Sequence, residues 1–480
     1  MEGIFLKIVL INPPDISVVR QSSSMQGIIF GAPLGIAYIA AVLEQVDFDV
    51  EIIDCPGESQ ERVFGWDEIC KAFQRSSPDL VGITTTTPTL MSAIELAKKS
   101  KEFFPKVPVV LGGHGTFALE KEILSRVKEV DFVVCREGEE TAVELATSYE
   151  KGSSLSSVRG ICFRRGNMII ETPQRDFIQN LDSIPFPARH LLPMKSYIQP
   201  LRYERRRGTT IVTSRGCPFS CVFCASSAFW GHKFRARSAE NVVEEIKHLH
   251  EVYGVHGLNG FYCGDDNFTA DKDRVLKICK LMIEQGLDDL RWSCQARVDC
   301  ADVELFEKMY KAGCRELEFG VESGSDEILR IIRKGITLDM VKRAVRMAKE
   351  ADLRAHGNFI IGLPRDTPKT IKQTIDFSEH GGFDTTSFAP TLVYPSTELS
   401  KHKNVDWLTF LLEEELANPS WLPFFHPCVP TYAERDKMKA VMKQIVIRKS
   451  MKIGLSLKWL AHPVATCRKI YQIIKLWRTS

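Results

Sequence analysis

Short apolar runs alternate with amphipathic stretches through the first third of the chain. The apolar runs predict buried strands over residues 7–11, 50–54, 80–84, 109–111 and 130–134. Between them, apolar positions recur every three to four residues, which predicts helices over 34–45, 66–74, 90–104 and 139–149. Alternating helices and nearly continuous apolar strands are typical of a doubly wound parallel sheet.

The residues that follow these predicted strands are small or polar. Ligands bind doubly wound sheets at the carboxyl ends of the strands, so this edge is a candidate binding site. A flat ligand with polar edges would suit it. The candidate positions are Asn12, Pro14, Thr85, Gly112, Gly113, His114 and Glu137.

After a predicted hairpin over 158–172 and a proline-rich linker over 184–193, the alternation resumes with longer helices. Strands are expected at 210–213, 260–263, 291–296, 316–320, 356–361 and 386–393. The clearest helices between them cover 241–253, 272–284, 303–312 and 338–351. Successive strand–helix units of this size predict an incomplete TIM-type barrel, whose chemistry belongs on the loops after the strands.

Composition places the chain among ordinary globular proteins, with 44% hydrophobic and 26% charged residues. Its fourteen cysteines are mostly scattered singly in apolar segments, as reduced thiols are. We see no signal peptide, and the longest apolar run, 31–43, is shorter than the roughly 20 residues that cross a bilayer. We therefore expect a cytoplasmic protein, with no nucleic-acid partner.

Charge is concentrated at the C-terminal end. Residues 433–480 hold twelve lysines and arginines against two acids, interleaved with apolar residues and tryptophans. Such a segment either packs as a helical cap on the barrel or lies on an anionic membrane surface. Peripheral membrane association and a lipid substrate remain open on this ground.

One loop carries the strongest chemical signal. Cys217, Cys221 and Cys224 directly follow the first predicted barrel strand with the spacing Cys-x3-Cys-x2-Cys. Iron–sulfur cubanes usually take four thiolates, so three leave one iron open for a substrate. A zinc site is the alternative, with His232 as a fourth ligand.

This loop resembles the signature of the radical S-adenosylmethionine (SAM) superfamily, including the aromatic residue before the last cysteine, here Phe223. The resemblance implies a [4Fe–4S] cluster and SAM at its open iron. It also implies one SAM contact after each of the next four strands. These contacts are Asp265 and Asp266 for the methionyl amino group, Arg297 for its carboxylate, Glu322 for the ribose, and Ile361 and Gly362 for adenine.

The N-terminal sheet, placed before such a barrel, resembles the cobalamin-binding domain of the cobalamin-dependent radical SAM class. The segments that carry the resemblance are 33–38, 112–114, 137–139 and 184–189. The motif Asp-x-His-x-x-Gly is absent, so cobalamin should lack a histidine as its lower ligand. We interpret His114 as a loop residue near the corrin edge.

The resemblance implies methyl transfer to an unactivated carbon through a 5′-deoxyadenosyl radical and methylcobalamin. An external one-electron donor of the ferredoxin or flavodoxin type would reduce the cluster, and the substrate would be a small molecule or a lipid. The alternatives are a cyclase or carbon–carbon bond-forming enzyme, a methylthiotransferase, and a non-catalytic cobalamin sensor. The expected domains are 1–150 for cobalamin, 151–200 as hairpin and linker, 201–400 as the barrel, and 401–480 as a helical C-terminal region.

Overall fold

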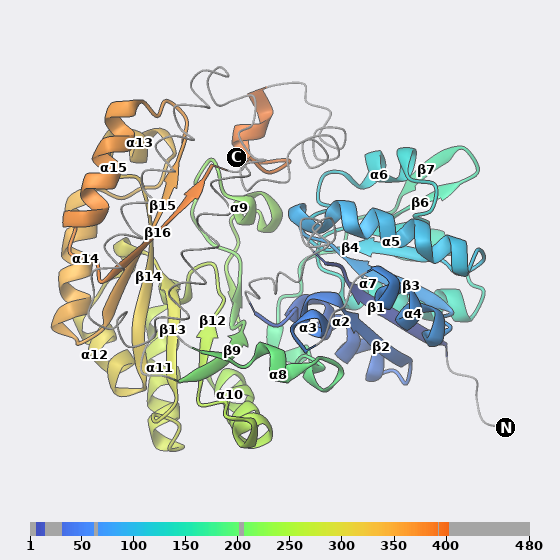
Figure 1. Cartoon of the computed structure of the whole chain (residues 1–480), viewed down its shortest axis with the longest axis horizontal. Helices are drawn as coiled ribbons and strands as arrows, with labels where there is room; N and C mark the ends of the chain where they lie inside the picture. Colours follow the sequence, from blue (N-terminus) through green and yellow to red (C-terminus); the bar gives the residue numbers. More distant parts are fainter. Residues whose placement is uncertain (1–5, 15–30, 62–65, 201–205, 392, 403–480) are drawn as a thin grey trace.

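The computed structural model describes residues 6–14, 31–61, 66–200, 206–391 and 393–402. The basic C-terminal segment expected to form a cap or a membrane anchor lies outside these residues. Two α/β units stand side by side, the N-terminal one on the right of Figure 1 and the other on the left. Within the described ranges, every helix is too short or too polar to cross a membrane.

The first sheet has seven strands in the order β2-β1-β3-β4-β5-β6-β7. The parallel strands are β1 (Lys7–Asn12), β2 (Asp49–Asp54), β3 (Leu80–Thr84), β4 (Val109–Gly112) and β5 (Phe132–Val134). The predicted hairpin forms β6 (Ile161–Arg165) and β7 (Met168–Glu171). It pairs antiparallel with β5 and so extends this sheet, which the local sequence pattern did not show.

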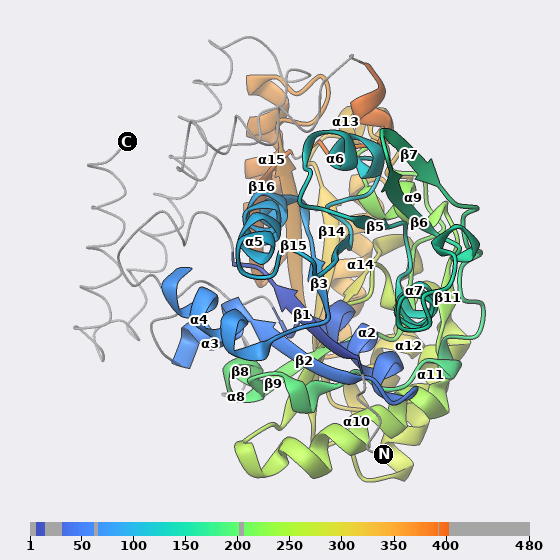
Figure 2. The ribbon, with the colours of Figure 1, turned by 90° about the vertical axis from the view of Figure 1, so that its right-hand side faces the viewer.

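Helices cover both faces of the first sheet, as its apolar strands predict. The bounds are α2 (Leu34–Glu44), α3 (Cys55–Glu61), α4 (Trp66–Ser76), α5 (Leu90–Phe103), α6 (Glu120–Arg126) and α7 (Glu139–Glu150). On β1, Ile8 and Leu10 pack with α2 and α7, whereas Val9 and Ile11 pack with α4, α5 and α6. Side chains that alternate between two buried faces confirm the doubly wound arrangement (Figure 2).

The second sheet also has seven strands, in the order β16-β15-β14-β13-β12-β9-β8. They are β8 (Gln199–Pro200), β9 (Arg207–Ile211), β12 (Gly260–Cys263), β13 (Arg291–Ala296), β14 (Cys314–Glu322), β15 (Arg354–Ile361) and β16 (Thr385–Pro390). All run parallel except the edge strand β8. A short ribbon, β10 (Ser214–Arg215) with β11 (Arg235–Ala236), stands apart. The sheet runs from β16 to β8 with no pairing recorded between these ends, so the barrel is incomplete.

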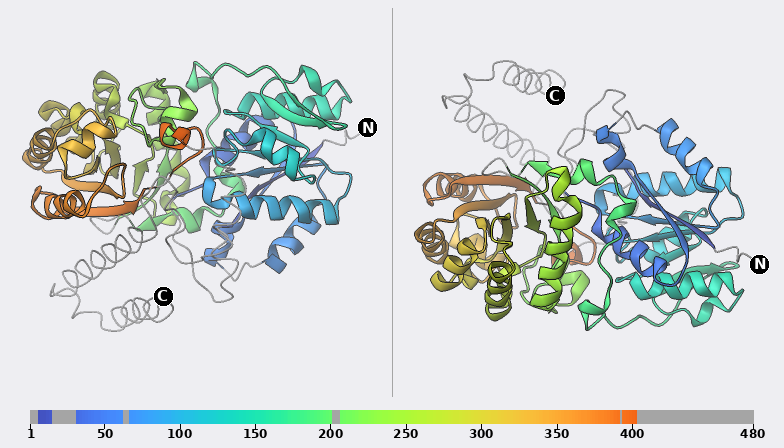
Figure 3. Two further views of the ribbon diagram at one scale, coloured as in Figure 1. Left: turned by 90° about the horizontal axis from the view of Figure 1, so that it is seen from above. Right: turned by 90° about the horizontal axis from the view of Figure 1, so that it is seen from below.

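Helices cover one face of the second sheet, and Figure 3 shows them along its outer side. They are α10 (Ala239–Tyr253), α11 (Lys272–Glu284), α12 (Val303–Lys311), α13 (Asp326–Ile331), α14 (Leu338–Glu350) and α15 (Pro368–His380). Phe261, Trp292 and Phe319 point from the strands into this helix layer and form its core. Two shorter helices, α8 (Met194–Tyr197) and α9 (Ala225–Trp230), lie between the units.

A buried contact ties the proline-rich linker to both units. Arg189 donates to Glu245 of α10 at 2.5 Å and to the Thr210 carbonyl at 3.1 Å. The neighbouring Ala188 N–H donates to the Ala37 carbonyl of α2 at 3.0 Å. Because both ends of this link are buried, the linker holds the two sheets in one relative orientation.

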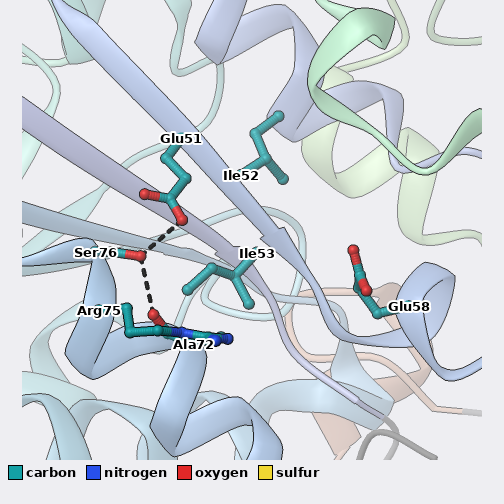
Figure 4. A pocket seen from close by; sticks show the side chains of 7 residues that line it. All are labelled: Glu51, Ile52, Ile53, Glu58, Ala72, Arg75 and Ser76. Carbon is teal, nitrogen blue, oxygen red and sulfur yellow. Dashed lines mark hydrogen bonds between the residues drawn. The ribbon is translucent and has the colours of Figure 1, made fainter. Parts of the chain in front are cut away.

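A pocket of about 320 Å³ lies between β2 and α4, beside the middle of an edge strand (Figure 4). Ser76 donates to Glu51 there at 2.7 Å, and Glu51 pairs with Lys7 at 3.2 Å. Its lining residues all belong to β2, α3 and α4, and none belongs to the cysteine loop. We therefore assign it no part in the chemistry.

Candidate functional site

The cysteine loop is anchored between the barrel strands and α9. Cys221 is buried, and Cys217 and Cys224 are half-buried. The Cys224 N–H donates to the Cys221 carbonyl at 3.1 Å, and the Val222 N–H donates to the Ile332 carbonyl at 3.1 Å. The loop is thus tied both to itself and to the barrel, with its sulfur atoms left available.

The loop has the chemistry that an iron–sulfur cluster needs. Burial raises the pKa of the Cys217 thiol to about 11, and metal binding there would displace its proton. Among the described residues, no three His, Cys, Asp or Glu side chains are grouped closely enough for a single metal ion. A cubane of four irons takes one thiolate per iron, and the three cysteines of this loop fit three of its irons. His232, the proposed zinc ligand, is exposed and has Nδ1 3.0 Å from the Phe219 carbonyl oxygen.

Arg297 lies against this loop from the end of β13. Its Nη1 is 3.9 Å from the Cys221 sulfur, and its guanidinium stands 3.6 Å from the centroid of the Phe219 ring. It pairs with Asp299 at 2.8 Å and donates to the Lys334 carbonyl at 2.7 Å. The Arg297 cation lowers the pKa of Cys217, which opposes the larger effect of burial.

The two neighbouring acids after β12 have different environments. Asp265 is fully buried and accepts hydrogen bonds from the Thr213 N–H at 2.7 Å and from the Ser214 hydroxyl at 2.6 Å. Asp266 is exposed and accepts from the Ser226 hydroxyl at 2.6 Å. Burial among surrounding atoms nevertheless raises the pKa of Asp266. Asp265 therefore supports the strand beneath the loop, whereas Asp266 is exposed beside it.

At the end of β14, Glu322 has a left-handed backbone with φ +70° and pairs with Lys334 at 2.8 Å. Gly320 makes room for this pair, because a Cβ there would come within 2.7 Å of the Glu322 carboxylate. On β15, Ile361 is fully buried, and the Gly362 N–H donates to Asp366 at 3.0 Å. Phe223 is half-buried against the barrel core.

The carboxyl edge of the first sheet is built from backbone and small side chains. Thr85 donates its hydroxyl to the Gly112 carbonyl at 2.8 Å, and Asn12 donates to Asp54 at 2.8 Å. Gly113 has φ +98°, and a Cβ there would come within 2.5 Å of the Thr85 carbonyl oxygen. Pro14 is buried. This glycine-rich, hydroxyl-bearing edge suits a large flat ligand that approaches the backbone closely.

His114 connects this edge to the barrel. Its ring centroid lies 4.3 Å from that of Phe229 on α9, the helix that starts directly after Cys224. The side chain is exposed to solvent, yet burial lowers its pKa, so the imidazole is neutral. The carboxyl edge of the first sheet therefore faces the cysteine loop.

A buried ion-pair network joins the same two regions. Arg215, two residues before Cys217, pairs with Glu137 at 2.7 Å and with Glu139 at 2.5 Å. Arg235 also pairs with Glu137 at 3.0 Å, and the Ile178 N–H donates to Glu137 at 2.9 Å. We name Arg215, Arg235, Glu137 and Glu139 the interdomain clamp. Both carboxylate oxygens of Glu137 accept hydrogen bonds within this clamp. Glu137, which the sequence suggested as a cofactor contact, therefore has a positioning role between the two units.

The sequence did not predict the clamp. Arg215 nevertheless lies just before the cysteine motif, and Glu137 and Glu139 belong to the segment that resembles the cobalamin-binding domain. Buried arginines next to a metal-binding loop are a usable signal, because each needs an acid partner. That the partner belongs to the other unit is visible only in three dimensions.

Comparisons with known proteins agree with this geometry. Residues 211–378 match the radical SAM superfamily, and residues 30–146 match the B12 binding domain. An uncharacterized methyltransferase of Pyrococcus horikoshii is 36% identical over 395 residues, which cover 82% of each chain. A cytidylyl-2-hydroxyethylphosphonate methyltransferase of Streptomyces wedmorensis is 29% identical over 74% of each chain.

An anaerobic magnesium-protoporphyrin IX monomethyl ester cyclase of Cereibacter sphaeroides is 31% identical over 71% of this chain and 55% of its own. Among solved structures, the radical SAM methyltransferase TsrM of Kitasatospora setae, with cobalamin and a [4Fe–4S] cluster bound, shares the fold. Its TM-score is 0.66 at 20% identity, covering 82% of this chain and 77% of its own. The chain therefore belongs to the radical SAM enzymes with a B12-binding domain, whose cofactors are a [4Fe–4S] cluster, S-adenosylmethionine and cobalamin.

Proposed function

We propose that this protein is a methyltransferase that acts on an unactivated carbon of a small molecule. The observation that carries the proposal is the contact between His114 and Phe229, which brings the ligand-binding edge of the first sheet to the cysteine loop. When bound, the cluster supplies the electron that cleaves SAM, and cobalamin supplies a carrier for the methyl group. The relatives named as methyltransferases support the same reaction.

The chain's own residues divide the task of holding these groups. Cys217, Cys221 and Cys224 are the only cysteines that share one loop at a strand end among the described residues, and we assign them as the cluster ligands. Arg297 contacts Cys221 and the Phe219 ring and so fixes this loop against the barrel. An external reductant of the ferredoxin or flavodoxin type serves the cluster.

We assign the methionyl end of SAM to the exposed surface beside the loop. Asp266 is the accessible acid there, so we assign it to the methionyl ammonium, because a carboxylate and an ammonium form charge-assisted hydrogen bonds. Glu322, held by Lys334 at the end of β14, is placed to accept from ribose hydroxyls. On the other side, Thr85, Gly113 and His114 offer the surface for cobalamin.

Isotope transfer tests the reaction. Reconstituted enzyme given SAM with a deuterated methyl group, a one-electron donor and a cell extract is expected to form a product heavier by that methyl group. It is also expected to form 5′-deoxyadenosine, and mass spectrometry reads both. Accumulation of 5′-deoxyadenosine with no labelled product would contradict methyl transfer and favour cyclisation or coupling.

The two neighbouring acids provide a matched pair of variants. Asp265→Ala should lower the free energy of unfolding by about 3 kcal/mol, because it leaves buried donors unsatisfied. Asp266→Asn should leave stability unchanged within about 0.5 kcal/mol and weaken SAM binding about tenfold. Denaturant titration and equilibrium dialysis measure these effects. Equal loss of stability in both variants would sink the assignment of Asp266 to SAM.

A further inference from the structure

Two cysteines that do not belong to the cluster loop lie against each other in the first unit. Cys135 directly follows β5 and Cys162 lies on β6, and their sulfur atoms are 3.7 Å apart. Both are free thiols, and both are buried. They are 27 positions apart in the chain, so the pairing of β5 with the hairpin strand β6 brings them together.

The register of this pairing puts both sulfur atoms on one side of the sheet. Cys162 stands opposite Val133, and the Cys135 N–H donates to the Gly160 carbonyl at 2.9 Å. Residues two apart on a strand share a face, so Cys135 points to the same side as Val133 and Cys162. Gly160, the residue opposite Cys135, has no side chain, so nothing there competes with the contact between the two thiols.

The two thiols can form a bond without rebuilding the sheet. The sulfur atoms of a disulfide are about 2.05 Å apart, so rotation of the two side chains must shorten the present separation. Cys135 lies just past Val134, the last residue of β5 paired with β6, and Arg136 after it has a left-handed backbone with φ +63°. Because the ladder ends and the chain turns here, a small shift of Cys135 breaks no further strand pairing.

The short helix α6 covers this pair. Cys135 and Cys162 share a core with Leu119, Ile123 and Leu124, of which the last two belong to α6, and α6 packs on both β5 and β6. The helix has seven residues, and helices of this length are stable only through their packing. Local opening of α6 therefore gives a reagent access to the sulfur atoms while the rest of the sheet stays folded.

The two ends of α6 are held differently. Beyond its C-terminal end, Arg164 of β6 donates to the Val127 carbonyl at 3.1 Å. On its first turn, Lys121 pairs with Glu171 of β7 at 2.6 Å in a contact open to solvent, and such a pair contributes little to stability. Glu120 and Glu171 both act on the two thiols electrostatically, so this first turn is close to the pair. We expect α6 to open from this turn.

The two thiols differ in access and in acidity. Cys135 keeps 7% of its surface exposed, and Cys162 keeps 1%. The hydrogen bond from the Cys135 thiol lowers the pKa of Cys162. Cys135 is therefore the sulfur that a reagent meets first, and Cys162 is the neighbour that more readily supplies a thiolate.

We propose that Cys135 and Cys162 form an oxidation site that reacts with a low-molecular-weight disulfide and becomes an intramolecular disulfide. The Cys135 sulfur attacks one sulfur of the reagent, and the other sulfur leaves as a thiol with the Cys135 proton. The Cys162 sulfur then attacks the Cys135 sulfur of this mixed disulfide, and the second half of the reagent leaves as a thiol with the Cys162 proton. Two cysteines are oxidised, and one reagent disulfide is reduced to two thiols. The new bond joins the hairpin to the strand end two residues before Glu137 of the interdomain clamp.

Glutathione disulfide is the probe, added without oxygen to full-length holoenzyme whose cluster cysteines are bound to iron. Remaining thiols are alkylated in denaturant, and mass spectrometry of a non-reduced digest reads each cysteine. We expect the Cys135 peptide to be linked to the Cys162 peptide, and dithiothreitol should reverse the link. Cys70, half-buried on α4, is the reagent control and should carry one glutathione. Alkylated Cys135 and Cys162 beside a glutathione-bearing Cys70 would overturn the proposal.

A second thiol pair shows whether the oxidation takes place in the folded protein. Cys294 on β13 and Cys314 on β14 are hydrogen-bonded to each other, and both are fully buried in the barrel core. They should stay thiols under the same treatment, because neither keeps any exposed surface. A Cys294–Cys314 link in equal yield would mean that the reagent acts on unfolded chains, which would contradict a site in the native structure.

Single substitutions separate the roles of the two cysteines. In Cys162→Ala, Cys135 should stop at the mixed disulfide with glutathione, whereas in Cys135→Ala, Cys162 should stay a thiol. Iron content and unfolding midpoint report whether each variant keeps its fold, and the wild-type experiment decides the proposal where one does not. Glutathione on Cys162 in folded Cys135→Ala, with none on Cys135 in folded Cys162→Ala, would overturn the order of attack.

Discussion

Cys221→Ala is expected to remove the bound iron and to abolish formation of 5′-deoxyadenosine. Cys221 is the buried cysteine of the three, it lies 3.9 Å from the Arg297 guanidinium, and the next residue is bonded to the barrel backbone. No other described sulfur lies on this loop apart from Cys217 and Cys224, so a lost ligand has no replacement there. Iron analysis, the visible absorption of the reconstituted protein and product chromatography measure the effect.

Cys70→Ala is the matched control. Cys70 is half-buried on α4, in the other unit, and its loss should leave iron content and 5′-deoxyadenosine formation unchanged. If Cys221→Ala kept full iron content and turnover, the cysteine loop would not be the cluster site.

Arg215→Leu is expected to lower the free energy of unfolding by about 3–5 kcal/mol, because it leaves Glu137 and Glu139 buried with part of their compensation gone. Burial alone would lower the pKa of Arg215, but the neighbouring carboxylates of Glu139 and Glu137 raise it, so the Arg215 guanidinium is charged. The structural consequence should be looser docking of the ligand-binding edge against the cysteine loop.

Loosened docking has a functional signature that instability alone lacks. Below the unfolding transition, the Arg215→Leu enzyme with its cluster intact should form several times more 5′-deoxyadenosine per methylated product than wild type. Proximity of the two cofactor sites is what the clamp supplies. Lys121→Leu, which breaks the exposed pair with Glu171, is the control and should change neither quantity. A normal product ratio in Arg215→Leu would show that the clamp contributes to stability only.

The sequence pattern predicted helices and strands well where short-range features decide them, namely the periodicity of apolar side chains and the residues that begin or end an element. The strands 260–263 and 291–296 and the helix 272–284 are found with the predicted bounds. Other elements differ by a few residues at their ends; β14, for instance, starts at Cys314 and reaches Glu322. The helices α3 and α6 were not predicted, because both are short and the apolar positions in their sequences show only weak periodicity.

The candidate site was predicted as a set of positions and not as an arrangement. Asp265 and Asp266 are neighbours of the same type, so no sequence rule separates the structural acid from the accessible one. The folded structure separates them by burial and by hydrogen-bond partners. Thr213 and Ser214 donate to the buried Asp265, whereas Ser226 donates to the exposed Asp266. Glu137 likewise follows a strand end as a ligand residue would, and only the arrival of Arg215 and Arg235 shows how it is used.

By itself, the sequence determined the two α/β units, the thiolate loop and the order of polar strand ends, because these depend on residues close together in the chain. The tertiary structure decided the rest: the hairpin's place in the first sheet and the clamp between the units. These depend on partners between about 30 and 80 positions away, such as Phe132 with Phe163 and Glu137 with Arg215. Packing brings such partners together, and no local pattern encodes which acid an arginine will meet.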